Sequence, residues 1–353
     1  MSELRGGFST GACAAAAAKA AALLLRGERS VTEVAIPFPD GTRESFVLET
    51  AELLGENQAR AAVRKSAGDD PDVTDKALVV ALVRAAAGET VAFRAGEGVG
   101  TVTKPGLSIP PGEPAINPGP RRMIAAALRE VSSGGYQVTI SIPGGAELAQ
   151  RTFNPRLGIA GGVSILGTTG RVVPFSCPAL REALACALDI AQAAGERAPV
   201  LVPGKIGKSA AERHFAPRSG QVVEVSNEWG YMLEKTVGRG FEALLLLGHP
   251  GKLAKLAMGY WDTHSRSSPS ASAYVRRIAA DLLGDAPPSE TVEGVLEALP
   301  PAGRRAVAER VAAEVARSAA ARLECGLVPA VVLIDMKGNI LGTSGELTRW
   351  NRA

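Results

Sequence analysis

A strand, a glycine-containing loop and a helix follow one another repeatedly in the second half of the chain, and this repetition constrains the fold more than any other feature. Alternating strands and helices imply parallel strand pairing, and a continuous apolar run such as A-L-L-L-L suits a strand buried on both faces. We therefore predict a doubly wound, mainly parallel sheet over residues 156–353, with a mainly helical stretch at 268–326. The predicted strands cover residues 163–166, 200–202, 222–225, 243–247 and 330–335.

Residues 1–155 lack this alternation and predict a separate α+β domain, so the expected fold is a two-domain combination of α+β and α/β. An Ala-rich helix is expected from Gly11 to about residue 26, with Ser9 or Thr10 as its N-cap and Gly27 at its end. The proline-dense run 109–120 is predicted to be neither helix nor central strand, because proline lacks the backbone donor. Other predicted elements are strands at 31–38, 44–49, 91–94 and 137–142 and helices at 76–87 and 121–131.

Composition excludes several classes of protein. With 353 residues, of which 46% are hydrophobic, the chain is long enough for about two domains and too apolar for disorder. A net charge of +3 and 4% aromatic residues provide neither the positive field nor the stacking surfaces that nucleic-acid binding uses. No apolar run is long enough for a membrane span, and Lys19 interrupts the Ala-rich segment that superficially resembles a signal peptide.

The cysteines argue against a disulfide framework and a structural zinc site, because none of them forms a Cys-x-x-Cys pair. We expect reduced thiols and a cytoplasmic location. No H-E-x-x-H spacing is present either, so no protein-bound metal is predicted. The four cysteines are Cys13, Cys177, Cys186 and Cys325.

The loops that follow parallel strands gather at one edge of a sheet, so four glycine-bearing loops are expected to line one crevice. Glycine there lets the backbone approach a phosphate or a nucleoside. The loop G-T-T-G alone is more typical of a tight turn, and the chain has neither a G-x-G-x-x-G nor a G-K-S/T motif, which disfavours nucleoside triphosphate hydrolysis. The crevice is the candidate site.

Two histidines and an acidic run are candidates for chemistry. His249 lies at a predicted strand end and His264 lies in D-T-H-S, whereas His214 is expected on a helix surface. The run at 68–72 is either an Asp-Pro turn whose carboxylates cap backbone amides or, through Asp70, an acceptor for ligand donors. For each of these groups a structural role and a functional role remain open.

Basic residues cluster in the same loops, where they form either a solvated face or a set of contacts to anionic groups. The clusters are Lys104 with Arg121 and Arg122; Lys205, Lys208, Arg213 and Arg218; and Lys252 with Lys255.

Several longer motifs resemble the cobalt-precorrin-5B C(1)-methyltransferase family of cobalamin biosynthesis, known as CbiD. They are F-S-T-G-A-C-A-A-A-A-A-K-A at 8–20, A-G-D-D-P-D-V-T at 67–74, G-E-G-V-G-T-V-T-K-P-G-L at 96–107, G-E-P-A-I-N-P at 112–118, T-F-N-P-R-L-G-I at 152–159, G-G-V-S-I-L-G-T-T-G at 161–170 and G-H-P-G-K-L-A-K-L-A at 248–257. Departures from the family pattern are Ser9 and Ala12 in place of Thr, Ser66 in place of an acidic residue, and M-G-Y-W-D-T-H-S in place of G-G-I-F-N-T-H-S.

The resemblance implies methylation of ring carbon 1 of a cobalt-bearing corrinoid precursor by S-adenosylmethionine, in the oxygen-independent pathway, with the cobalt belonging to the substrate. The donor is expected at Gly167, Thr168, Thr169 and Gly170, with Glu224 as a ribose partner. The carboxylate-fringed ring is expected between the two domains, where Asp70, His249 or His264 orients it or assists a proton. Substrate carboxylates are assigned to Lys104, Arg121, Arg122, Lys205, Lys208 and Lys252.

Two other functions stay open at this point. A nucleotide-dependent oxidoreductase would use the same doubly wound half to bind a nicotinamide cofactor, and a non-catalytic tetrapyrrole carrier would use the basic loops without transferring a methyl group. The sequence does not give the oligomeric state, and a homodimer stays open.

Overall fold

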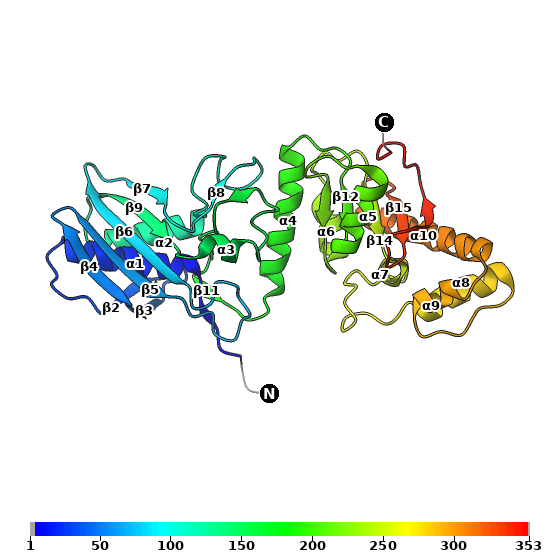
Figure 1. Cartoon of the computed structure of the whole chain (residues 1–353), viewed down its shortest axis with the longest axis horizontal. Coiled ribbons are helices and arrows are strands. Elements are labelled where there is room, and N and C mark those ends of the chain that lie inside the picture. Colours follow the sequence, from blue (N-terminus) through cyan, green and yellow to red (C-terminus); the bar gives the residue numbers. More distant parts are fainter. Residues whose placement is uncertain (1–3, 352–353) are drawn as a thin grey trace. The chain divides into compact units, whose positions relative to one another are not determined.

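The computed structural model describes residues 4–351 and divides into two compact units, Met1–Cys177 and Pro178–Ala353 (Figure 1). This boundary lies later than the predicted one between residues 155 and 156. The reason is that the intervening segment pairs with unit 1: β10 (Ile159–Ala160) lies antiparallel to β8 (Thr101–Val102), and β11 (Arg171–Val172) lies antiparallel to β1 (Gly7–Phe8).

Unit 1 is built on a five-stranded sheet in the order β4-β5-β6-β9-β7, in which only β7 and β9 pair in parallel. The predicted helix at 76–87 is wrong, because these residues form the central strand β6. Buried and partly exposed residues alternate along the first part of β6, which is the period of two of a strand. Its valines favour a strand, whereas its alanines and arginine make the strand hard to recognise in the sequence. The strand bounds are β4 Thr50–Gly55, β5 Gln58–Arg64, β6 Leu78–Ala86, β7 Val91–Ala95 and β9 Gly135–Ser141.

The Ala-rich helix is confirmed as α1 (Thr10–Leu25), and the Ser9 hydroxyl caps it by accepting from the Ala12 N–H at 3.2 Å. It is buried almost all round, because it contacts β5, β6 and the second helix, α2 (Pro118–Arg129). Alanine leaves little side-chain bulk between these backbones.

The expectation that 109–120 holds no helix is wrong for its last residues, because α2 begins at Pro118. A missing N–H costs nothing at the first position of a helix. The strands predicted at 31–38 and 44–49 are confirmed as β2 (Glu33–Pro37) and β3 (Arg43–Val47), which pair antiparallel as a hairpin. Helix α3 covers Gly145–Ala149.

Unit 2 contains the predicted doubly wound sheet, in the order β13-β12-β14-β15-β16. The first four strands of this order are parallel and β16 is antiparallel to β15. The strands predicted near 200, 222, 243 and 330 are confirmed. The strand predicted at 163–166 is wrong as a member of this sheet, because its residues make only isolated bridges, Val163 with Val99 and Ile165 with Ile116, inside unit 1. The bounds are β12 Val200–Val202, β13 Val222–Glu224, β14 Leu245–Gly248, β15 Ala330–Ile334 and β16 Ile340–Ser344.

Helices cover both faces of this sheet. Helix α5 packs on one face, where its Ala210, Ala211 and Phe215 join one cluster with alternate residues of β12, β14 and β15. The intervening residues of these strands point to the opposite face, on which α7 and the long α10 contact β15. The helix bounds are α4 Cys177–Ala193, α5 Lys205–Phe215, α6 Trp229–Thr236, α7 Pro250–Ala257, α8 Ser272–Leu283, α9 Val292–Glu297 and α10 Pro301–Leu323. None of the helices in the described part of the chain combines the length and apolar character that crossing a bilayer requires.

Close backbone contacts hold the glycine-rich segments of unit 1 together. Gly98 has φ +70°, and a Cβ atom there would lie 1.9 Å from the carbonyl oxygen of Ile142. A Cβ atom on Gly162 would lie 2.2 Å from the carbonyl oxygen of Gly98. These glycines are therefore required by packing between segments, independently of any ligand.

This packing predicts a large loss of stability for Gly98→Ala. We expect the free energy of unfolding to fall by about 2–5 kcal/mol, from the left-handed backbone and the steric overlap together. Gly112→Ala is the matched control, because Gly112 also has positive φ but a Cβ atom there meets nothing within 4 Å. Its loss should be only about 1–2 kcal/mol. Chemical denaturation followed by circular dichroism measures both, and equal losses would contradict the packing account.

Candidate functional site

The candidate site lies at the edge of the unit 2 sheet where the parallel strands end. In the order β13-β12-β14-β15 the chain enters at β12, adds β13 on one side and then returns to add β14 on the other. The connections from β12 and β14 leave toward opposite faces, to α5 and α7, and ligands of open α/β sheets bind where the order reverses in this way. Three of the four predicted glycine loops, after β12, β13 and β14, meet at this edge.

The fourth loop, G-T-T-G, does not follow a strand of this sheet, so the premise on which the donor was placed there is wrong. Gly167 and Gly170 lie in unit 1, whereas Glu224 ends β13 in unit 2. The loop closes over the beginning of α1: the Gly11 N–H donates to the Leu166 carbonyl at 3.0 Å, and a Cβ atom on Gly167 would lie 2.2 Å from the Ser9 hydroxyl. Both Thr168 and Thr169 are exposed. Packing on a helix terminus therefore accounts for glycine at 167.

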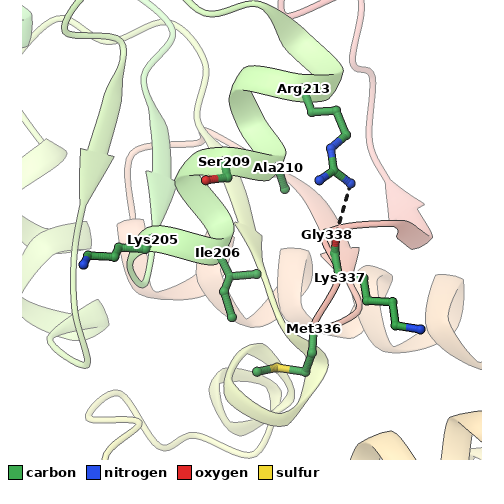
Figure 2. Close-up of a pocket in the computed structure, with 8 residues that line it drawn as sticks. All are labelled: Lys205, Ile206, Ser209, Ala210, Arg213, Met336, Lys337 and Gly338. Atoms are coloured by element: carbon green, nitrogen blue, oxygen red, sulfur yellow. Dashed lines mark hydrogen bonds between the residues drawn. The ribbon is translucent and has the colours of Figure 1, made fainter.

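A pocket of about 200 Å³ opens between α5 and the turn that joins β15 to β16 (Figure 2). The turn is held against the helix by Arg213, whose Nη1 donates to the Lys337 carbonyl at 3.0 Å, and by His214, whose Nε2 is 2.8 Å from the Gly338 carbonyl oxygen. His214 is thus half-buried and structural, contrary to the predicted surface position. The lining residues are Lys205, Ile206, Ser209, Ala210, Arg213, Met336, Lys337 and Gly338.

His249 directly follows β14 and is the N-cap of α7. Its Nδ1 accepts from the Gly251 N–H at 3.0 Å, so the proton of the neutral ring must sit on Nε2. Nε2 is covered by protein atoms and has no partner among the described residues. Burial lowers the pKa of His249 below the usual histidine value, against the opposing charges of Glu293 and Asp335. The ring is therefore a neutral donor of one hydrogen bond.

A polar network ties the loop after β13 to α7 and to the D-T-H-S segment. Lys252 donates to the Asn227 side-chain oxygen at 2.7 Å, and the Thr263 hydroxyl donates to the same oxygen at 3.2 Å. Burial lowers the pKa of Lys252, and neighbouring Lys255 acts in the same direction. The ammonium group of Lys255 is itself buried and donates to the Thr263 carbonyl and the Ser268 hydroxyl. The basic residues at 252 and 255 are thus internal supports of the edge.

His264 and Asp70 are engaged with the backbone. His264 is exposed, and its Nδ1 accepts from the Arg266 N–H at 3.1 Å. Asp70 lies in unit 1 and accepts from the Phe175 N–H at 2.8 Å. Phe175 has φ +56°, so the Asp70 carboxylate holds a strained backbone position. The other aspartates of the acidic run bind Arg5, Lys65 and Thr74 and form a structural turn.

The six basic residues predicted to bind substrate fall into two groups, three in each unit. In unit 1, Arg121 is committed to the loop before α2 through the carbonyls of Ile116 and Pro114 and the carboxylate of Glu113. The aliphatic part of the Lys104 side chain lies across Gly158. Within the described residues, neither the ammonium group of Lys104 nor the guanidinium group of the exposed Arg122 has a partner. In unit 2, Lys205 lines the pocket, Lys208 lies 4.0 Å from Glu212 and Lys252 supports Asn227.

Sequence reasoning missed Met336 and Lys337 as pocket residues. The signal that was available is the run D-M-K-G-N after a predicted strand, which is typical of a tight hairpin turn. Within residues 4–351, no group of three or more His, Cys, Asp or Glu side chains is arranged to hold a metal ion. The cationic side chains that line the pocket and the Nε2–H of His249 suit the binding and orientation of an anionic ligand.

The His249 geometry predicts its titration. Nuclear magnetic resonance of ¹⁵N-labelled rings should show the proton of the neutral His249 ring on Nε2, and a pKa below the usual value of about 6.5. As pH falls, His249 takes up its second ring proton at higher pH in the unfolded chain than in the folded chain. The free energy of unfolding is therefore greatest above about pH 6.5 and decreases as pH falls toward the pKa of His249 in the folded state. A ring protonated on Nδ1, or a pKa above 6.5, would contradict this geometry.

Comparison with known proteins supplies the family. The family model described as CbiD matches residues 1–174, and the one described as CbiD, C-terminal domain, matches residues 262–345. A protein of Syntrophotalea carbinolica named cobalt-precorrin-5B C(1)-methyltransferase is 53% identical over 99% of this chain and 100% of its own. A protein of the same name from Moorella thermoacetica is 40% identical over 97% of this chain and 95% of its own.

A crystal structure described as a cobalamin biosynthesis protein (cbiD) from Archaeoglobus fulgidus is 30% identical, covers 72% of this chain and 80% of its own, and superposes with a TM-score of 0.39. The sequence matches extend over both units and include the motifs singled out above. The chain belongs to the CbiD family.

Proposed function

We propose that this protein transfers the methyl group of S-adenosylmethionine to carbon 1 of cobalt-precorrin-5B, giving cobalt-precorrin-6A in anaerobic cobalamin biosynthesis. The observation that carries the proposal is the match over 99% of the chain to a relative with this activity in its name. The cobalt is part of the substrate. A cytoplasmic location and a possible homodimer stay predictions.

The chemistry fits the side chains that the edge provides. The carbon–sulfur bond of the donor breaks as the carbon–carbon bond to the ring forms, and S-adenosylhomocysteine leaves. Such an in-line displacement needs alignment and exclusion of water more than a protein nucleophile. Good alignment alone accounts for about 7–11 kcal/mol of barrier. Exposed Lys205 and Lys337 at the pocket provide positive charge for a substrate that carries many carboxylates.

We place the donor at the reversal of strand order in unit 2, in place of the loop at 167–170. The loops after β12 and β14 both carry glycine and leave toward opposite faces. The Nε2–H of His249 is a buried donor without a partner among the described residues, which costs about 1–3 kcal/mol. An acceptor atom of the donor nucleoside would recover this cost. Because Nε2 is covered, binding requires the surrounding loop to open.

The proposal predicts a stoichiometric methyl transfer. Incubation with S-adenosylmethionine and cobalt-precorrin-5B should raise the mass of the tetrapyrrole by one methyl group and form S-adenosylhomocysteine in equal amount. Mass spectrometry measures both products, and heat-inactivated protein is the control. Retention of the tetrapyrrole with no gain of mass would favour a carrier, and turnover that requires a nicotinamide cofactor would favour an oxidoreductase; either outcome overturns the proposal.

A further inference from the structure

The pocket between α5 and the turn at 336–338 has an apolar floor. Ile206 is 41% exposed and Met336 is 50% exposed, although both are large hydrophobic residues. Figure 2 shows their side chains directed to the same side, below the first turns of α5. Ala210 and Gly338 add no polar side chain to this floor. A short alkyl chain lying here would cover two exposed apolar side chains, which is favourable in proportion to the area removed from water.

The rim of the same pocket is basic. Lys205 and Lys337 extend from opposite ends of it in Figure 2, and Arg213 lies at its wall. No acidic residue lines it. Two carboxylates directly precede lining residues in the chain. Asp335 accepts from the backbone N–H groups of Lys337 and Asn339 and from the Asn339 side chain, and Glu212 lies 4.0 Å from Lys208. The long stems of the two lysines let both ammonium groups turn toward an anion at the mouth.

An apolar floor under a basic rim matches a short alkyl chain that ends in a carboxylate. We propose that this pocket binds one aliphatic carboxylate arm of the tetrapyrrole substrate. The inference rests on the proposed function, because that reaction supplies such an arm. At about 200 Å³ the pocket is smaller than the roughly 300–1,000 Å³ of sites that enclose a whole small molecule, so it takes an arm and not the ring.

The methionine part of the methyl donor also ends in a carboxylate, but it carries an ammonium group on the adjacent carbon. Three cationic side chains, Lys205, Arg213 and Lys337, would repel that group, and no lining carboxylate would compensate it. The charges of the pocket therefore favour a plain carboxylate over an amino acid. This preference separates the two sources of carboxylate in the reaction.

Met336 provides a local probe. The chain has five methionines. In protein labelled with ¹³C-methyl-methionine, the resonance that disappears in the variant Met336→Leu is that of Met336. Propionate should shift the Met336 methyl resonance in a saturable way, propylammonium should leave it in place, and S-adenosylhomocysteine should not compete with propionate for the pocket. The double variant Lys205→Gln/Lys337→Gln should weaken propionate binding roughly two- to thirtyfold, from two exposed charge interactions. Arg276→Gln, which removes an exposed charge on α8 away from the pocket, should leave the affinity for propionate unchanged.

Equal shifts with propylammonium, unchanged propionate affinity in the double variant, or no shift with propionate would each overturn the inference. A shift with S-adenosylhomocysteine that propionate reverses would assign the pocket to the donor and overturn it as well. The result is separable from the proposed function. Methyl transfer without a propionate site refutes only the pocket assignment. A charge-dependent propionate site in a protein without methyl transfer refutes the proposed function and removes the assignment of the arm to that substrate.

Discussion

The reversal of strand order between β12 and β14 is the constraint on which the candidate site depends. Neighbouring parallel strands whose connections both left toward the same face would leave no gap at their carboxyl ends. Here the chain leaves β12 toward α5 and β14 toward α7, on opposite faces of the sheet. The His249 ring, the pocket beside α5 and the Asn227 network are all anchored to strand ends at this edge. The chemistry of the edge thus follows from the topology of the sheet.

Small side chains provide the corresponding constraint in unit 1. Helix α1 is almost entirely buried because alanine adds little bulk between it and its neighbours, and Gly98 and Gly162 let two loops pass at backbone contact distance. Several motifs that identify the family, including those at 96–107 and 161–170, therefore meet one another in the folded unit. Packing is a sufficient reason for much of their glycine content. A glycine-rich motif is consequently weaker evidence for a ligand than its spacing suggests.

The sheet of unit 2 could be predicted because its strands are continuous apolar runs buried on both faces, separated by helices of ordinary length. The segment at 163–166 has the same apolar character, but its partners Val99 and Ile116 lie far away in the sequence and no local pattern reveals them. Strand β6 was mistaken for a helix because alanine and arginine favour helix locally, while pairing with β5 and β9 decides the outcome. His249 and Lys205 could be placed at the edge, whereas Met336 and Lys337 could not, since their position depends on how the turn packs against α5.

The central claim is that the adenosyl donor binds at the edge where β12 and β14 end. Hydrogen–deuterium exchange with and without S-adenosylhomocysteine tests it most directly, because binding slows exchange where backbone amides become covered. The account predicts slower exchange at residues 203–206 and 249–252 and no change at 166–170. Slower exchange confined to 166–170, with residues 203–206 and 249–252 unaffected, would contradict it.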